Sequence, residues 1–184
     1  MRVIAGSLRG RRLVAPRGRG TRPTPDRVRE ALFSALGPLE GLSVLDLYAG
    51  SGALAIEALS RGAARAVVVE RSAPALRALR QNLAGLELTQ ACEVLPVAVE
   101  RAAALVAQRG PFALVLADPP YGDDGAGAAI DHVLAASQVL APSARVAVEH
   151  SARVEPPPLD SLQRQRTRRY GDTAVTLYER DPGG

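Results

Sequence analysis

The feature that most constrains the fold is a regular alternation of apolar segments and helical patterns over residues 43–150. The apolar segments are continuous runs of Val, Leu and Ala, which is typical of parallel strands covered on both faces. We expect these strands at 43–48, 65–70, 91–96, 112–117 and 144–150. Helices are expected between them, at 52–61, 73–84, 98–108 and near 125–140. Such alternation predicts a doubly wound α/β sheet.

The two ends of the chain depart from this alternation. Residues 1–24 contain glycines and prolines that break helices, which predicts an extended or hairpin arm. A helix is expected at 25–36, because Pro25 and Asp26 suit a first helical turn. Near the C-terminus, two segments flank Gly171 and indicate an antiparallel hairpin at the sheet edge. The expected organisation is a basic arm of residues 1–24 before one domain of residues 25–184, with seven strands in a mostly parallel sheet.

Positive charge gathers in the arm. Nine of the 23 basic residues, all of them arginine, lie within residues 1–29 against one acid, Asp26. That segment is therefore +8 and the remainder −4, consistent with the total of +4. A polyanion such as nucleic acid is the predicted partner, and a solvated basic tail is the alternative. The candidate phosphate-binding residues are Arg9, Arg11, Arg12, Arg17, Arg19 and Arg22.

A glycine-rich loop, DLYAGSGALA, follows the first predicted strand. Gly50, Gly52 and Ala55 match the G-x-G-x-x-G/A fingerprint, and ligands of doubly wound sheets bind beyond the carboxyl ends of the strands. The second strand ends in Glu70, an acid suited to bonding ribose hydroxyls. Asp46 would repel the pyrophosphate of a dinucleotide but would favour the ammonium group of S-adenosylmethionine. The loop thus predicts S-adenosylmethionine; the alternative is that Asp46 only caps the loop by accepting its N–H groups.

The fourth strand runs directly into an acid, two prolines and a tyrosine, in the stretch LVLADPPY. The prolines fix the backbone there, which suits a rigid turn or a built site. With a methyl donor over the loop, Asp118 and the Pro119 carbonyl can accept the N–H groups of a base amine and position its nitrogen. Tyr121 offers a stacking face. The base would have to be unpaired or flipped out.

These motifs resemble known families. Asp118-Pro119-Pro120-Tyr121 is similar to the [DN]-P-P-[YFW] motif of the amine-methylating class I S-adenosylmethionine-dependent methyltransferases. TRPTPDRVREALF (21–33), DLYAGSGALAIEALSRGA (46–63) and LADPPY (116–121) together resemble the RsmD-type 16S ribosomal RNA guanine-N2 methyltransferases. The arginine arm and the ending YGDTAVTLYER extend the resemblance over nearly the whole chain.

The resemblance implies a Rossmann-like methyltransferase sheet, S-adenosylmethionine as cofactor and guanine in small-subunit rRNA as substrate. It also implies an assembling small ribosomal subunit as the partner. The implied catalytic residues are Asp118, Pro119, Pro120 and Tyr121. The implied cofactor-binding residues are Asp46, Ala49, Gly50, Ser51, Gly52, Glu70 and Ala98.

One region departs from the class I pattern. Many of these enzymes place an acid or amide after the third strand, near the adenine of the cofactor. Here that region reads LPVAVER, with only Glu100, set inside the predicted helix. We therefore expect backbone atoms around Val97 and Ala98 to hold the adenine.

Other functions remain open at this point. The motif cannot distinguish a guanine amine from the adenine-N6 or cytosine-N4 amine of DNA or other RNA. A nucleotide-dependent oxidoreductase and a non-catalytic RNA-binding protein are further alternatives, disfavoured by Asp46 and by the intact 118–121 motif, respectively. The single Cys92 and the absence of long apolar runs predict a cytoplasmic protein without a disulfide, a metal site or a membrane span.

Overall fold

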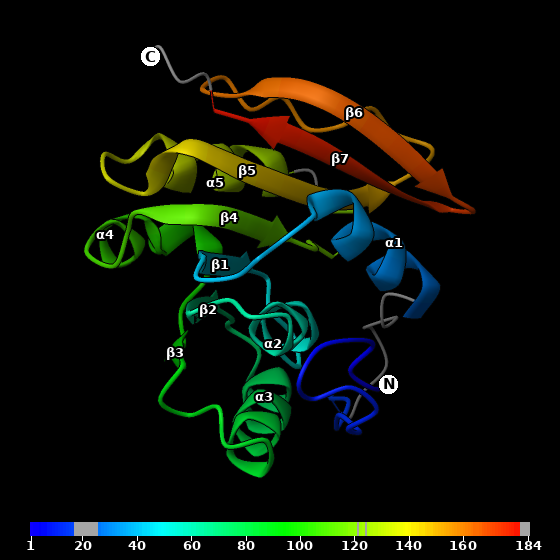
Figure 1. Cartoon of the computed structure of the whole chain (residues 1–184). Coiled ribbons are helices and arrows are strands. Elements are labelled where there is room, and N and C mark those ends of the chain that lie inside the picture. The colour runs from blue at the N-terminus through cyan, green and yellow to red at the C-terminus, as the bar shows by residue number, and fades with distance from the viewer. Residues whose placement is uncertain (17–25, 121, 124, 181–184) are drawn as a thin grey trace.

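The computed structural model describes residues 1–16, 26–120, 122, 123 and 125–180. Within them, seven strands form one sheet in the order β3-β2-β1-β4-β5-β7-β6 (Figure 1). Strands β1 to β5 are mutually parallel, and β7 pairs antiparallel with both β5 and β6. The strands are β1 (Ser43–Leu47), β2 (Arg65–Val69), β3 (Cys92–Leu95), β4 (Phe112–Ala117), β5 (Leu140–Ser151), β6 (Gln163–Tyr170) and β7 (Thr173–Glu179). The predicted doubly wound sheet with its C-terminal hairpin is confirmed.

Helices cover both faces of the sheet (Figure 1). One face carries α1 (Asp26–Leu36), α2 (Ala53–Ser60) and α3 (Ala73–Gly85). The other carries the 3₁₀ helix η1 (Val99–Arg101), α4 (Ala103–Ala107) and α5 (Ala126–Ala135). Neighbouring residues of one strand serve opposite cores: Val44 packs on the first face and Leu45 on the second. No helix among the described residues is long and apolar enough to cross a membrane.

Two predicted helices were wrong in extent. The segment 98–108 is not one helix, because Arg101 and Ala102 donate to carbonyls three residues back and form the tighter η1 turn before α4. The helix expected near 125–140 ends at Ala135, and β5 already begins at Leu140. The Val139 carbonyl accepts the Phe112 N–H at 2.8 Å, so pairing beside β4 overrides the helical pattern of this segment.

The N-terminal residues form a hairpin attached to α2 and α3. Arg2 and Arg12 form an antiparallel bridge, and the Val3 N–H donates to the Arg11 carbonyl at 3.0 Å. The buried Glu57 of α2 accepts the N–H groups of residues 4 and 5 at 2.7 and 3.0 Å. The apolar side chains of Val3 and Leu13 are buried in the core of the first face. The division into an arm of 1–24 and a domain of 25–184 stays a prediction, since residues 17–25 lie outside the described part of the chain.

Candidate functional site

The predicted site residues follow three neighbouring strands at the same edge of the sheet. In the β-sheet register, Leu47 of β1 pairs with Val69 of β2 and with Ala117 of β4. The residues that come next are Tyr48, Glu70 and Asp118. Parallel strands present their carboxyl ends on one edge, so the loop after β1 and the motif after β4 lie side by side.

Glu70 holds the glycine-rich loop against the end of β2. One of its carboxylate oxygens accepts the Gly50 N–H at 2.7 Å, and the other accepts the Ser72 N–H at 2.7 Å. Gly50 has a φ of 57°, and a Cβ there would meet no atom of the described residues within 4 Å. The loop therefore has open space above Gly50, and each oxygen of Glu70 retains a lone pair for a ligand hydroxyl.

Asp46 is fully buried at the end of β1. One carboxylate oxygen, Oδ2, accepts the Ala55 N–H in the first turn of α2 at 3.1 Å, while Oδ1 is buried and has no hydrogen-bond partner within the described part of the chain. Burial raises the pKa of Asp46 well above its usual value, and the negative charges of Asp118 and Glu70 raise it further. The carboxylate thus does cap a helix, but it also has a vacant acceptor. An ammonium group from a ligand would supply the missing donor and stabilise the charged form, so this site fits the zwitterionic end of S-adenosylmethionine.

Gly52 and Ser51 shape the start of α2. Gly52 precedes this helix with a φ of 82°, and a Cβ there would lie 2.4 Å from Cδ1 of the buried Leu79. The carbonyl of Ser51 accepts an N–H from the buried Asn82 at 2.9 Å. Ala49 is buried, and its N–H donates to the Val69 carbonyl at 3.0 Å. The loop conformation therefore depends on both β2 and α3.

Asn82 also fixes the N-terminal segment. It accepts the Val14 N–H at 2.8 Å and donates to the Val14 carbonyl at 3.0 Å. The Asn82 side chain thereby connects the N-terminal segment to the glycine-rich loop, through its hydrogen bond to the Ser51 carbonyl. The sequence signal for this role was a polar residue on the inward face of the helix expected at 73–84.

Tyr48 is a further residue of the site that sequence reasoning missed. It adopts a left-handed conformation with a φ of 64°, which is uncommon for a bulky residue. Its hydroxyl is buried and has no hydrogen-bond partner among the described residues. Burial, followed by the charges of Glu100 and Asp123, raises the pKa of Tyr48 to about 12. The signal was its place inside the loop motif, between the acid and the first glycine.

The motif after β4 lies close to Asp46, whose pKa responds to the charge of Asp118. Asp118 and Pro119 are half-buried, and Pro120 is exposed. The Pro120 carbonyl accepts the Asp123 N–H at 3.2 Å, which turns the chain toward α5. Tyr121 lies outside the described residues. The roles assigned to Asp118, Pro119, Pro120 and Tyr121 remain predictions.

The region after β3 also reaches this edge. Ala98 precedes η1, and its carbonyl accepts the Arg101 N–H at 3.0 Å. Glu100 is exposed on η1 rather than set within a regular α-helix, and it pairs with Arg71 at 3.9 Å. Because its charge acts on Tyr48, Glu100 lies nearer the loop than the sequence indicated. The expected adenine contact at Val97 and Ala98 stays a prediction.

Three of the six candidate arginines of the arm are described, and all three are exposed on the N-terminal hairpin. These are Arg9, Arg11 and Arg12. Arg11 donates to the Gly85 carbonyl at the end of α3, at 3.0 Å. The others, Arg17, Arg19 and Arg22, lie outside the described residues.

Comparison with known proteins gives concordant matches along nearly the whole chain. The profile of a family described as "Conserved hypothetical protein 95" matches residues 1–179. The chain is 39% identical to "Putative rRNA methyltransferase YlbH" of Bacillus subtilis, over 98% of this chain and 99% of that protein. It is 38% identical to "Ribosomal RNA small subunit methyltransferase D" of Escherichia coli, over 100% of this chain and 92% of that protein. The solved structure of "Putative methyltransferase yhhF" from Escherichia coli is 36% identical, with a TM-score of 0.83 over 99% of this chain and 98% of that one.

Proposed function

Because the chain belongs to the family described as "Conserved hypothetical protein 95", whose relatives include rRNA methyltransferases, we propose that it methylates the exocyclic N2 amine of a guanine in 16S rRNA. At the coarser level, the protein is an S-adenosylmethionine-dependent rRNA methyltransferase with the Rossmann-like methyltransferase fold. The observation that carries the amine-methylation step is the shared sheet edge, where the half-buried Asp118 lies beside the open glycine loop. The choice of guanine in 16S rRNA rests on the resemblance of residues 21–33, 46–63 and 116–121 to the RsmD-type enzymes.

Binding of the cofactor in this mechanism depends on hydrogen-bond acceptors and open space around the glycine-rich loop. S-adenosylmethionine supplies an electrophilic methyl group when bound. The vacant Oδ1 of Asp46 would hold the ammonium of its amino acid end, and Glu70 would accept from the ribose hydroxyls. Gly50 leaves room for the ligand to approach the backbone. Ala49, Ser51, Gly52 and Ala98 complete the proposed cofactor-binding set.

The substrate half depends on hydrogen-bond acceptors. An aromatic amine is a weak nucleophile because its lone pair is delocalised into the ring. The Asp118 carboxylate and the Pro119 carbonyl would each accept one amine N–H, which orients the nitrogen lone pair toward the methyl group. Pro119 and Pro120 hold these acceptors in place, since their rings fix the backbone. Tyr121 would stack on the base, which has to be unpaired or flipped out to enter.

The arginines of the N-terminal segment supply the proposed affinity for RNA. Arg9, Arg11, Arg12, Arg17, Arg19 and Arg22 would contact phosphates, which gives affinity and register but little sequence information. The proposed natural partner is 16S rRNA within an assembling small ribosomal subunit in the cytoplasm. The Asp118 pocket then determines which amine is methylated, whereas the arm contributes only affinity for a negatively charged backbone.

The test is nucleoside mapping of 16S rRNA. Deletion of the gene should remove one N2-methylguanosine from 16S rRNA, as measured by mass spectrometry of nuclease fragments. The purified protein with S-adenosylmethionine should restore it on small subunits from the deletion strain. Loss of an N6-methyladenosine or N4-methylcytosine instead would overturn the guanine proposal, and an unchanged modification pattern would overturn the rRNA proposal.

A further inference from the structure

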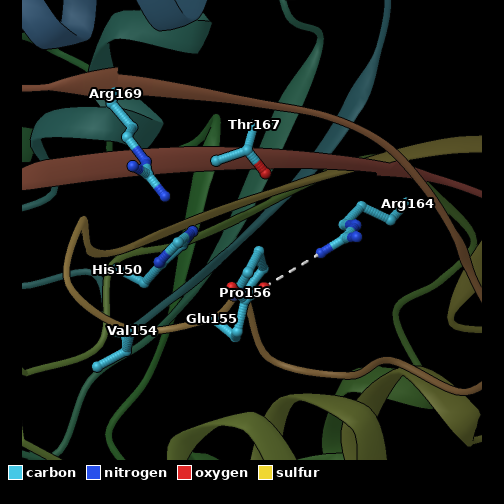
Figure 2. Close-up of a pocket in the computed structure, with 7 residues that line it drawn as sticks. All are labelled: His150, Val154, Glu155, Pro156, Arg164, Thr167 and Arg169. Carbon is cyan, nitrogen blue, oxygen red and sulfur yellow. Dashed lines mark ion pairs between the residues drawn. The ribbon is translucent and has the colours of Figure 1, made fainter.

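A second feature at the same sheet edge is a cavity of about 380 Å³ on the β5–β7–β6 side (Figure 2). Its walls come from the end of β5, the following loop and β6. The lining residues are His150, Val154, Glu155, Pro156, Arg164, Thr167 and Arg169. Figure 2 shows the Arg169 side chain extending from β6 toward the His150 ring. None of these residues belongs to the methyl-transfer site described above.

The β-sheet register places this cavity next to the amine-binding motif. Ala117 of β4 pairs with Val148 of β5, so His150 is level with Pro119, one strand away. Val148 pairs with Thr176 of β7, which pairs in turn with Thr167 of β6. Strand β6 therefore runs parallel to β4 and β5, and three strand spacings, about 14 Å, separate it from β4. A nucleotide adjoining the methylated base would lie over this part of the edge.

The donors of His150 and Thr167 are already used inside the protein. The His150 Nδ1 lies 3.0 Å from the Ser151 carbonyl, and its Nε2 lies 2.8 Å from the Thr176 hydroxyl. The Ser151 carbonyl can only accept a hydrogen bond, so Nδ1 carries a proton, and burial lowers the pKa of His150, which favours the neutral ring with an acceptor at Nε2. Thr176 then donates to the ring, and Thr167 donates its own proton to Thr176 at 2.8 Å. The groups left to bind a ligand are therefore the guanidinium groups of the arginines.

Arg164 and Arg169 supply those groups. Arg164 pairs with the Glu155 carboxylate at 3.7 Å, and both side chains are exposed, at 57% and 90% (Figure 2). An exposed pair of this kind contributes little free energy, and a backbone phosphate, whose single negative charge is shared by two oxygens, can displace it. Arg169 has no ion pair among the described residues. The Glu155 carboxylate thus shows where an anion can lie beside Arg164, and its weak ion pair leaves this position open to exchange with a phosphate.

We propose that this cavity binds a backbone phosphate of the RNA substrate, adjacent to the nucleotide whose base enters the Asp118 pocket. The proposal rests on the proposed function, because it names a second contact with the same RNA. Arg164 and Arg169 clamp the phosphate, and the neutral His150 and the loop around Pro156 form the wall. The clamp orients the flipped nucleotide from the β6 side, while the arm contacts the RNA on the α2–α3 side.

Strand β6 provides a matched control. Arg164 and Arg169 pair with Tyr178 and Ala174 of β7 and share the cavity face, whereas Arg166 and Arg168 lie on the opposite face. All four are exposed. The variants Arg164→Ala/Arg169→Ala and Arg166→Ala/Arg168→Ala therefore remove the same charge from the same strand on different faces.

The experiment measures binding of in vitro transcribed 16S rRNA by filter retention over a range of salt concentrations. The cavity variant should bind about tenfold more weakly, with a log–log salt slope lower by about 1–2 units. The opposite-face variant should change affinity by less than about threefold. Both should keep the wild-type melting temperature and S-adenosylmethionine affinity. Glu155→Gln, which removes the competing anion, should bind the RNA more tightly than wild type.

Wild-type affinity in the cavity variant, or an equal loss in both double variants, would overturn the phosphate clamp. The second result would mean that β6 contributes only general positive charge. These outcomes are distinguishable from failure of the proposed function, since in that case the wild-type protein itself would not methylate small subunits from the deletion strain.

Discussion

The loop after β1 and the motif after β4 face the same sheet edge but are held by different means. Hydrogen bonds from distant side chains fix the loop: Glu70 binds the Gly50 N–H, and Asn82 binds the Ser51 carbonyl. The motif after β4 takes its rigidity from two consecutive proline rings, which have no N–H to donate. Asp46 is fully buried, whereas Asp118 is half-buried and Pro120 is exposed.

This difference matches the ligands proposed for each half. A small cofactor can be enclosed, so its site is buried, and the buried atoms without a hydrogen-bond partner among the described residues include Oδ1 of Asp46 and the Tyr48 hydroxyl. A large RNA has to approach from solvent, so its site is open and flanked by exposed arginines on the hairpin and on β6. Substitutions in the two halves should therefore affect different measurements.

The largest expected effect follows Asp118→Ala. Loss of one preorganised acceptor should lower the methyl-transfer rate by about 10²-fold or more, by analogy with the removal of an oxyanion-hole donor. Cofactor affinity should change little, because this carboxylate is assigned to the substrate amine. Single-turnover kinetics and calorimetry measure the two quantities. Asp118→Asn keeps one acceptor oxygen and should lose less, and near-wild-type turnover of the alanine variant would remove Asp118 from its role.

Glu70→Ala should show the opposite pattern. The Gly50 and Ser72 N–H groups lose their acceptor, so cofactor binding should weaken by about 1–3 kcal/mol. Calorimetric titration with S-adenosylmethionine measures this loss, and NAD serves as the comparison ligand. Tight NAD binding without S-adenosylmethionine binding by the wild type would contradict the cofactor assignment.

Substitutions in the arm test whether RNA contacts extend to the side of the molecule that carries the cofactor-binding loop. Replacing Arg9, Arg11 and Arg12 by alanine should lower the log–log salt slope of RNA binding by about 2–3 units, at about 0.7–0.9 per phosphate contact. S-adenosylmethionine affinity should not change. A control that replaces the exposed Arg77, Arg80 and Arg101 removes equal charge. If the arm variant keeps the wild-type slope, the arm does not touch RNA.

The paired variants Gly50→Ala and Gly52→Ala distinguish a position that leaves room for the ligand from a position that is packed inside the protein. Both positions have positive φ, so each alanine should cost about 1 kcal/mol of folding free energy. At Gly52 the new Cβ also meets Leu79, which should add about 1–3 kcal/mol. Thermal unfolding should therefore show the larger loss for Gly52→Ala. Gly50→Ala should instead weaken cofactor binding, and equal cofactor affinity to wild type would contradict an approach of the ligand over Gly50.

Much of the fold was predictable because strand and helix patterns are local. The apolar runs ending at Leu47, Val69 and Ala117 predicted buried parallel strands, and their order along the chain predicted a common carboxyl edge. The error at Leu140 arose because an alanine-rich segment suits a helix, while its pairing with Phe112 is a long-range contact. The roles of Asn82 and Glu57 were missed for the same reason, since their partners lie 68 and about 52 residues away.

By itself, the sequence determined the fold class, the family and the residue types of the candidate site. Hydrophobic periodicity and short motifs such as DPPY act through neighbours in the chain, so a linear reading can find them. Only the tertiary structure decided that, among the described residues, Oδ1 of Asp46 and the Tyr48 hydroxyl are buried without a hydrogen-bond partner, and that Arg164 and Arg169 share a cavity with His150. Burial, vacant acceptors and the facing of side chains across β5, β7 and β6 depend on segments far apart in sequence, and those meet only when the sheet closes.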